Sequence, residues 1–235
     1  MHSFGPVFHR AAQHVTDAIA IRALQCFPGS MGESCRLLVL TGGPGAGKTA
    51  VLEVVRRTFH RGVAVLPEAA SILCSGGFPR RKDVAGHRSV QRAIYHVQRE
   101  LERIALDHPP DINGVHGGRT RRPVILCDRG TLDGLAYWPG DEADFFRDLG
   151  TTLEAELARY HAVIHLQTPP PGNGYDHSNP VRTESPEEAA ALDLRILEVW
   201  SRHPDRFVVA STARFMDKVD RVLALVSAEA GEREG

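Results

Sequence analysis

The chain has 235 residues, a formal net charge of −1, and hydrophobic and charged contents of 42% and 24%. That length suits one domain, or one domain with an appendage, and it can bury a substantial core. The near-neutral charge gives no support for broad nucleic-acid binding, and no apolar run approaches the ~20 residues needed to cross a bilayer. The four cysteines form no C-x-x-C pair, which indicates reduced thiols rather than a disulfide or zinc framework. We therefore expect a cytoplasmic protein.

Residues 1–34 precede the first apolar strand and are interpreted as an N-terminal extension. They lack the basic-then-apolar plan of a signal peptide, and residues 14–24 have the spacing of a short amphipathic helix. No chemistry is assigned to this segment. The main domain is expected at 35–228, followed by a polar tail at 229–235.

The most informative stretch begins with an apolar, β-prone run, residues 37–40, and continues as Thr41-Gly42-Gly43-Pro44-Gly45-Ala46-Gly47-Lys48-Thr49. It fits the phosphate-loop pattern G-x-x-x-x-G-K-[ST], and a helix-compatible segment follows it. Glycines let successive main-chain amides curl around phosphate oxygens, and the helix N-terminus adds partial positive charge. The alternative is a glycine-rich turn with a chance Lys-Thr. We predict a nucleoside triphosphate site.

Each part of this loop has an expected role. Lys48 would reach the β- and γ-phosphates, and the Thr49 hydroxyl would ligate Mg²⁺. The residues expected to hold the triphosphate are Gly43, Pro44, Gly45, Ala46, Gly47, Lys48, Thr49 and Ala50.

After the loop, helical and strand patterns alternate along the chain. We expect helices at 48–60, 89–106, 142–160, 186–202 and 214–226, and further strands at 63–67, 123–127, 162–166 and 207–210. Short apolar strands alternating with helices predict an α/β domain with a parallel sheet covered on both faces.

Two acidic residues lie where predicted strands end, which is where open parallel sheets bind ligands. Glu68 follows the second strand, where a carboxylate can accept a proton from a substrate hydroxyl or hold it in line with the γ-phosphate. The alternatives are a helix N-terminal acid or an indirect role at Mg²⁺. Asp128 closes the third strand, and such a carboxylate binds Mg²⁺ opposite Thr49.

Three arginine-containing features complete the candidate site. Arg129, beside Asp128, could contact phosphate or pair with an acid, although Asp128-Arg129-Gly130 could also be a surface turn. Arg182 lies in an irregular segment after the fourth strand, where a lid arginine would neutralise charge on the transferred group. A solvated charge is the alternative. The basic run at 80–82 is interpreted as a solvated loop, with contact to an anionic acceptor as its alternative.

Taken together, these segments resemble the nucleoside and nucleotide kinase branch of P-loop proteins, and within it the NadR-type family of AAA ATPases and kinases. The resemblance spans roughly residues 36–226 and is carried by 41–49, 67–70 with 76–79, 128–130 and 182–184. It implies a three-layer P-loop NTPase fold with a five-stranded parallel sheet in the order 2-3-1-4-5. Deoxynucleoside kinases, which this region resembles, use an acid after their second strand to hold the acceptor.

The leading hypothesis is an ATP- and Mg²⁺-dependent kinase acting on a small nucleoside-like or nucleotide-like acceptor. Its expected catalytic residues are Lys48, Glu68, Asp128, Arg129 and Arg182, with Thr49 and Asp128 as metal ligands. The alternative is a nucleotide-binding regulatory ATPase or GTPase without a small-molecule acceptor. No nucleic-acid or membrane partner is expected. The acceptor, the preference for ATP or GTP and the oligomeric state, a homodimer included, are left open.

Overall fold

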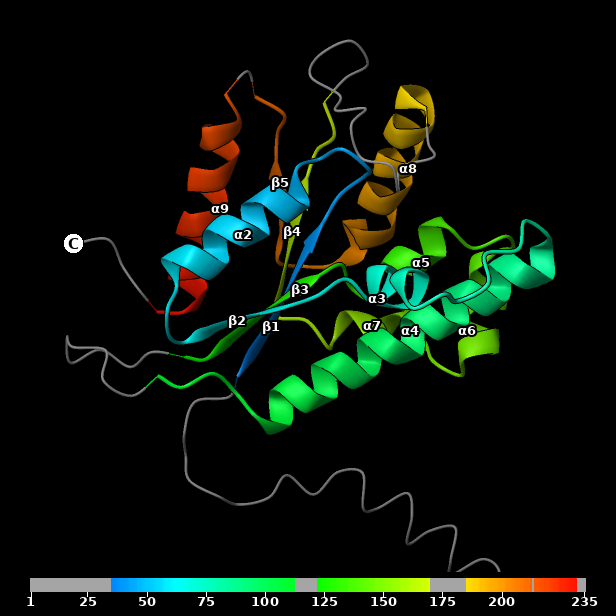
Figure 1. Cartoon of the computed structure of the whole chain (residues 1–235), viewed down its shortest axis with the longest axis horizontal. Coiled ribbons are helices and arrows are strands. Elements are labelled where there is room, and N and C mark those ends of the chain that lie inside the picture. Colours follow the sequence, from blue (N-terminus) through cyan, green and yellow to red (C-terminus); the bar gives the residue numbers. More distant parts are fainter. Residues whose placement is uncertain (1–34, 113–121, 170–184, 213, 232–235) are drawn as a thin grey trace, which may run out of the picture. The chain divides into compact units, whose positions relative to one another are not determined.

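The structure is a computed structural model, and it describes residues 35–112, 122–169, 185–212 and 214–231 (Figure 1). The strands are β1 (Arg36–Thr41), β2 (Val63–Leu66), β3 (Val124–Asp128), β4 (Ala162–Leu166) and β5 (Arg206–Val209). The helices are α2 (Lys48–Thr58), α3 (Ala69–Ser75), α4 (Val84–Asp107), α5 (Asp133–Ala136), α6 (Glu142–Leu149), α7 (Leu153–Leu157), α8 (Pro186–Val199), the 3₁₀ turn η2 (Trp200–Arg202) and α9 (Phe215–Glu229).

The five strands form one parallel sheet in the order β2-β3-β1-β4-β5, which confirms the predicted fold class. In the register of this sheet, Leu40 of β1 pairs with Asp128 of β3, and Leu66 of β2 pairs with Cys127. The carboxyl ends of β2, β3 and β1 therefore lie side by side. Connections that leave these ends can bring their side chains to one place.

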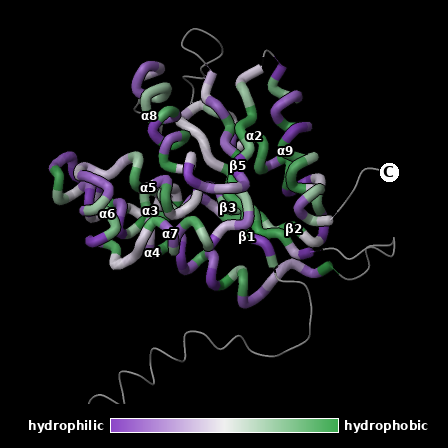
Figure 2. The backbone as a smooth tube through the Cα atoms, turned by 180° about the vertical axis from the view of Figure 1, so that it is seen from behind, coloured by the Kyte–Doolittle hydropathy of each residue, from purple (hydrophilic) through white to green (hydrophobic). Residues whose placement is uncertain are grey.

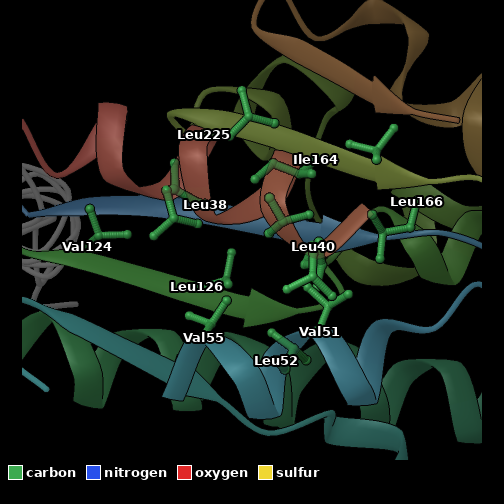
Figure 3. Packing of buried hydrophobic residues seen from close by; sticks show 14 of the residues in the cluster. Leu38, Leu40, Val51, Leu52, Val55, Val124, Leu126, Ile164, Leu166 and Leu225 are labelled. Atoms are coloured by element: carbon green, nitrogen blue, oxygen red, sulfur yellow. The ribbon is translucent and has the colours of Figure 1, made fainter. Parts of the chain in front are cut away.

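The two faces of the sheet carry separate apolar clusters because successive strand residues point to opposite sides. Leu38 and Leu40 of β1 pack with α2 and α9, as the close view in Figure 3 shows, whereas Leu37 and Val39 belong to the cluster with α4, α6 and η2. Figure 1 places α2 and α9 together on one face and α4 on the other. In Figure 2 the strands are mainly hydrophobic, while α4 alternates between hydrophobic and hydrophilic residues.

The helices differ from the sequence-based prediction in several places. The helix expected over 142–160 is two helices, because Gly150 adopts a left-handed conformation after α6 and Thr152 caps the N-terminus of α7. The helix α4 begins at Val84 rather than 89, with the Asp83 side chain accepting a hydrogen bond from the Gly86 amide. The short helix α3 was not predicted, and Glu68 is its N-cap residue.

The proposed extension at 1–34 and most of the polar tail lie outside the described residues, so the domain bounds stay predictions. The helix α9 continues to Glu229, beyond the predicted 226. Within the described part of the chain, no helix combines the length and the apolar composition needed to span a membrane.

Replacing Leu40 by alanine tests the packing that supports the site. Leu40 is fully buried at the centre of the sheet, directly before the phosphate loop. We expect Leu40→Ala to lower the free energy of unfolding by about 2–5 kcal/mol, because it removes a buried side chain and leaves a cavity. The control is Leu194→Ala on α8, where the leucine is 66% exposed and the change should be within about 0.5 kcal/mol. Urea unfolding of both variants measures this, and equal losses would contradict the assigned core.

Candidate nucleotide-binding site

The phosphate loop has the backbone conformation that its glycines predict. Gly42, Gly45 and Gly47 all have positive φ angles, of 137°, 80° and 92°. A side chain at Gly42 would place its Cβ only 2.1 Å from the Leu166 carbonyl oxygen, so no other residue fits there. The loop is therefore fixed against β4 while it turns into α2.

The N-terminus of α2 is open to a ligand. Its N-cap residue is Gly47, no side chain accepts a hydrogen bond from the first-turn amides, and the first turn contains no acidic residue. Amides of this kind need an acceptor from outside the helix, and they attract anions. Pro44, Gly45, Ala46, Gly47, Lys48 and Thr49 line one cavity of about 500 Å³. Two other predicted phosphate-binding residues, Gly43 and Ala50, do not line it.

Lys48 lies within this cavity and bends back over the loop. Its Nζ donates to the carbonyl oxygens of Gly42 and Gly43 at 2.7 and 3.0 Å. Burial, together with the nearby Arg129 guanidinium, lowers the pKa of Lys48 to about 7, although Asp128 and Glu68 oppose this effect. A polyphosphate here would supply the negative charge that favours the ammonium form.

Asp128 is the final residue of β3 and has the features of a metal ligand. Its Oδ1 is buried and has no hydrogen-bond partner among the described residues. Burial raises the pKa of Asp128 to about 6, with Glu68 and Asp133 adding to the rise and Lys48 and Arg129 opposing it. A carboxylate oxygen without a partner is the ligand type that Mg²⁺ prefers, and Mg²⁺ needs only one or two such groups beside phosphate oxygens. Asp128 and Thr49 thus fit the predicted ion.

Arg129, the next residue, also lines the cavity and joins Glu68 to the phosphate loop. It is the one non-glycine residue with a positive φ angle, 73°, in the described part of the chain. Such a backbone conformation is strained and is often found at functional sites. The guanidinium donates to Glu68 Oε1 at 2.6 Å and to the Gly42 carbonyl at 3.4 Å. The structure therefore brings Glu68, Arg129 and the phosphate loop together, as expected.

Glu68 is held as a carboxylate by these contacts. Burial acts to raise its pKa, but the charge of Arg129 and hydrogen bonds from Ser71 and Arg129 outweigh it, so the pKa lies below its usual value. Glu68 occupies the N-cap position of α3, but its side chain accepts no hydrogen bond from the amides of that helix and lines the cavity instead.

Asp133, which sequence reasoning missed, forms an ion pair with Arg129. This buried carboxylate lies 3.5 Å from the guanidinium and accepts hydrogen bonds from the Thr41 hydroxyl and the Gly130 amide. Gly130 allows this arrangement, since a Cβ there would lie 2.7 Å from the Trp200 ring. The signal in the sequence is weak: an acid five residues after a strand.

Asp193 of α8 is a second carboxylate that sequence reasoning missed. Its Oδ1 accepts from the Gly43 amide at 2.7 Å and lies 3.0 Å from His165 Nε2, and its Oδ2 accepts from the Thr168 amide at 3.1 Å. The Gly43 amide is thus engaged within the protein rather than turned to the cavity. Asp193 joins the phosphate loop to α8 and to the end of β4.

Beyond Glu68 the cavity continues between two helices. The helix α3 contributes Ala69, Ala70, Ser71 and Cys74, and α4 contributes Val90, Gln91, Ile94, Tyr95 and Gln98. Behind these residues, buried Glu102 and Glu156 accept hydrogen bonds from Gln98 and Tyr95 at 2.8 and 2.7 Å. Paired polar groups of this kind hold the back wall in one arrangement.

One predicted catalytic residue is not placed. Arg182 lies outside the described residues, so its lid role stays a prediction. Three aromatic side chains have different surroundings: Tyr137 lines the cavity, Phe78 lines a separate hollow, and Trp138 is buried against Phe145.

The sheet order and the phosphate loop define a P-loop protein with a nucleotide-binding site. A protein-family model described as an AAA domain matches residues 37–218, more than half of the chain, and the protein belongs to this AAA domain family. The predicted class, a P-loop phosphotransferase or ATPase, is confirmed at the level of the family and the fold. Among curated proteins, none matches this chain.

Solved structures show the same fold. Deoxyadenosine kinase from M. mycoides, with products dCMP and a flexible dCDP bound, is 11% identical with a TM-score of 0.51, over 82% of this chain and 99% of that one. The same enzyme with bound dATP is 13% identical with a TM-score of 0.53, over 81% of this chain and 99% of that one. NadR in complex with NAD and AMP-PNP is 12% identical with a TM-score of 0.56, over 86% of this chain and 51% of NadR. The chain therefore spans about half of that protein. At these identities the likeness is one of fold.

The displaced pKa of Lys48 predicts that polyphosphate binding takes up a proton. At pH 8 the free lysine, with a pKa of about 7, is mainly uncharged, and the bound phosphate favours its ammonium form. As far as Lys48 is concerned, affinity for magnesium–ATP should therefore be highest below pH 7, where the free lysine is charged. It should fall as the pH rises above 7. Calorimetry at pH 8 in buffers of different ionisation enthalpy measures the proton uptake. Lys48→Arg, which stays charged, should abolish it, and wild-type heats independent of the buffer would refute the assignment.

Proposed function

We propose that this protein is an ATP- and Mg²⁺-dependent kinase that transfers the γ-phosphoryl group to a hydroxyl or phosphate of a small nucleoside-like or nucleotide-like acceptor. The observation that carries the proposal is the position of Glu68. This carboxylate lines the same cavity as the phosphate loop, and the cavity extends past it between α3 and α4. The space beyond Glu68 is suited to a second substrate beside the triphosphate.

The donor half of the reaction depends on the loop. The amides at the start of α2 and the Lys48 ammonium would bind the triphosphate, and Arg129 would neutralise charge that develops on the transferred group. ATP as donor is supported by the fold relatives, which were solved with dATP or AMP-PNP. Mg²⁺, held by Thr49 and Asp128, would bridge phosphate oxygens and offset their charge.

The acceptor half depends on Glu68. Because its pKa is lowered, Glu68 stays ionised at neutral pH and accepts hydrogen bonds. One of its oxygens faces Arg129, so the two residues would place an acceptor hydroxyl in line with the γ-phosphate. The contribution of Glu68 would come mainly from orientation, since a carboxylate of low pKa is a weak base. A regulatory switch, the alternative function, has no use for a second-substrate space of this kind.

The first experiment asks whether an acceptor is phosphorylated at all. The protein is incubated with magnesium–ATP and a panel of nucleosides and nucleoside monophosphates, and the products are identified by mass spectrometry. A phosphorylated acceptor is expected. ADP release at one rate with every acceptor and without any would instead support the regulatory NTPase.

Replacing Glu68 by glutamine separates acceptor positioning from donor binding. We expect Glu68→Gln to keep the affinity for magnesium–ATP and to lower transfer by about 100-fold, because the carboxylate that orients the acceptor is lost while the side-chain shape remains. Glu53→Gln is the matched control, since Glu53 lies on the exposed side of α2 and pairs with Arg57. Transfer rates and calorimetry on both variants test this, and unchanged transfer in the Glu68 variant would remove that residue from the mechanism.

A further inference from the structure

The three residues of the basic run Arg80-Arg81-Lys82 have different surroundings. Arg81 pairs with Asp83, Nε to Oδ2 at 3.1 Å, and lines a separate hollow of about 530 Å³. Lys82 lines neither the hollow nor the cavity. Arg80 alone of the three lines the cavity that holds Lys48 and Glu68. Arg80 is exposed, as the interpretation of a solvated loop expects, but it also lines this cavity, which leaves open the alternative of contact with an anionic acceptor.

Arg80 also differs from the other cations of the cavity in having no protein partner. Lys48 donates to two loop carbonyls, and Arg129 is engaged by Glu68, Asp133 and the Gly42 carbonyl. In the part of the chain that the structure describes, Arg80 makes no hydrogen bond or ion pair. Its guanidinium can bind an incoming anion without giving up an existing contact.

The position of Arg80 in the chain associates it with the acceptor rather than the triphosphate. It lies in the connection between α3 and α4, the two helices that wall the cavity beyond Glu68. The triphosphate would use the part of the lining that is built by the phosphate loop and the start of α2. A free cation on the acceptor side favours a substrate with its own negative charge.

We propose that the acceptor carries an anionic group, a phosphate or a carboxylate, and that Arg80 recognises it. This inference rests on the proposed kinase function and narrows the acceptor from a neutral or charged nucleoside-like or nucleotide-like compound to one that carries an anionic group. Arg80 acts as a specificity-determining residue, since the transfer itself is handled by Lys48, Glu68 and Arg129. The apolar and amide side chains of α4 contact the rest of the acceptor.

The test compares neutral and anionic acceptors that share a base and a sugar. Because a 5′-monophosphate offers a phosphate in place of the 5′-hydroxyl, the dependence of the preference on Arg80 decides the test, rather than the preference alone. Five nucleosides and their 5′-monophosphates are assayed with magnesium–ATP, using wild type, Arg80→Ala, Arg80→Lys and the control Arg81→Ala. Wild type should show at least about tenfold higher kcat/KM for the monophosphate of its preferred pair, the size expected of one charged hydrogen bond. Arg80→Ala should remove this preference without changing the KM for ATP, Arg80→Lys should restore part of it, and Arg81→Ala should leave it intact. Added salt should weaken the preference because Arg80 is exposed.

The outcomes separate this proposal from the proposed function. Transfer to neutral nucleosides with equal or higher kcat/KM would support a kinase and overturn the anionic acceptor. An equal loss on both acceptor types in Arg80→Ala would likewise overturn it. If no transfer occurs, thermal stabilisation by the monophosphates in the presence of AMP-PNP is measured instead. Stabilisation that depends on Arg80 supports the anion site while rejecting the kinase, and its absence overturns the anion site.

Discussion

The site depends on a short loop of main chain being held rigidly at the carboxyl edge of the sheet. Three contacts from distant elements fix it: Gly42 lies against the Leu166 carbonyl, the Gly43 amide donates to Asp193, and Lys218 of α9 donates to the carbonyls of Ala46 and Gln167. Amides stabilise a bound anion well only if they are already oriented before it arrives. Packing of β4, α8 and α9 around the loop provides that orientation.

Rigid placement leaves the charges of the site in an unfavourable state without a ligand. Burial pushes the pKa of Lys48 down and that of Asp128 up, so each group is drawn toward its neutral form. A polyphosphate stabilises the charged lysine, and a divalent cation stabilises the charged carboxylate. Since the two ligands correct opposite shifts, their binding should be mutually favourable. Groups with perturbed pKa values cluster at functional sites, so the two shifts together favour a ligand site here.

The donor side of the site could be read from the sequence because its signals are local. The loop pattern with the strand before it, the acid after β2 and the acid that ends β3 can each be recognised from a few neighbouring residues. The sheet order came from the family resemblance, since no spacing along the chain fixes which strands pair. The break at Gly150 and Thr152 has a signal in the sequence, a helix-ending glycine followed by a capping threonine, although one helix was predicted across it.

The remaining parts of the site were missed for a different physical reason. Asp193 and Gly43 are 150 positions apart, and an acid within a helix gives no local sign that its partner is a main-chain amide of a distant loop. The same holds for the part of the cavity beyond Glu68, where Glu68, Arg80 and one face of α4 are separated in the sequence and are brought together only by the fold. Binding of a triphosphate requires a compact motif, whereas selection among acceptors requires a shaped space built by separate helices. Under the proposed function, a chain with this loop would keep its donor chemistry and change its substrate through residues of α3, α4 and their connection.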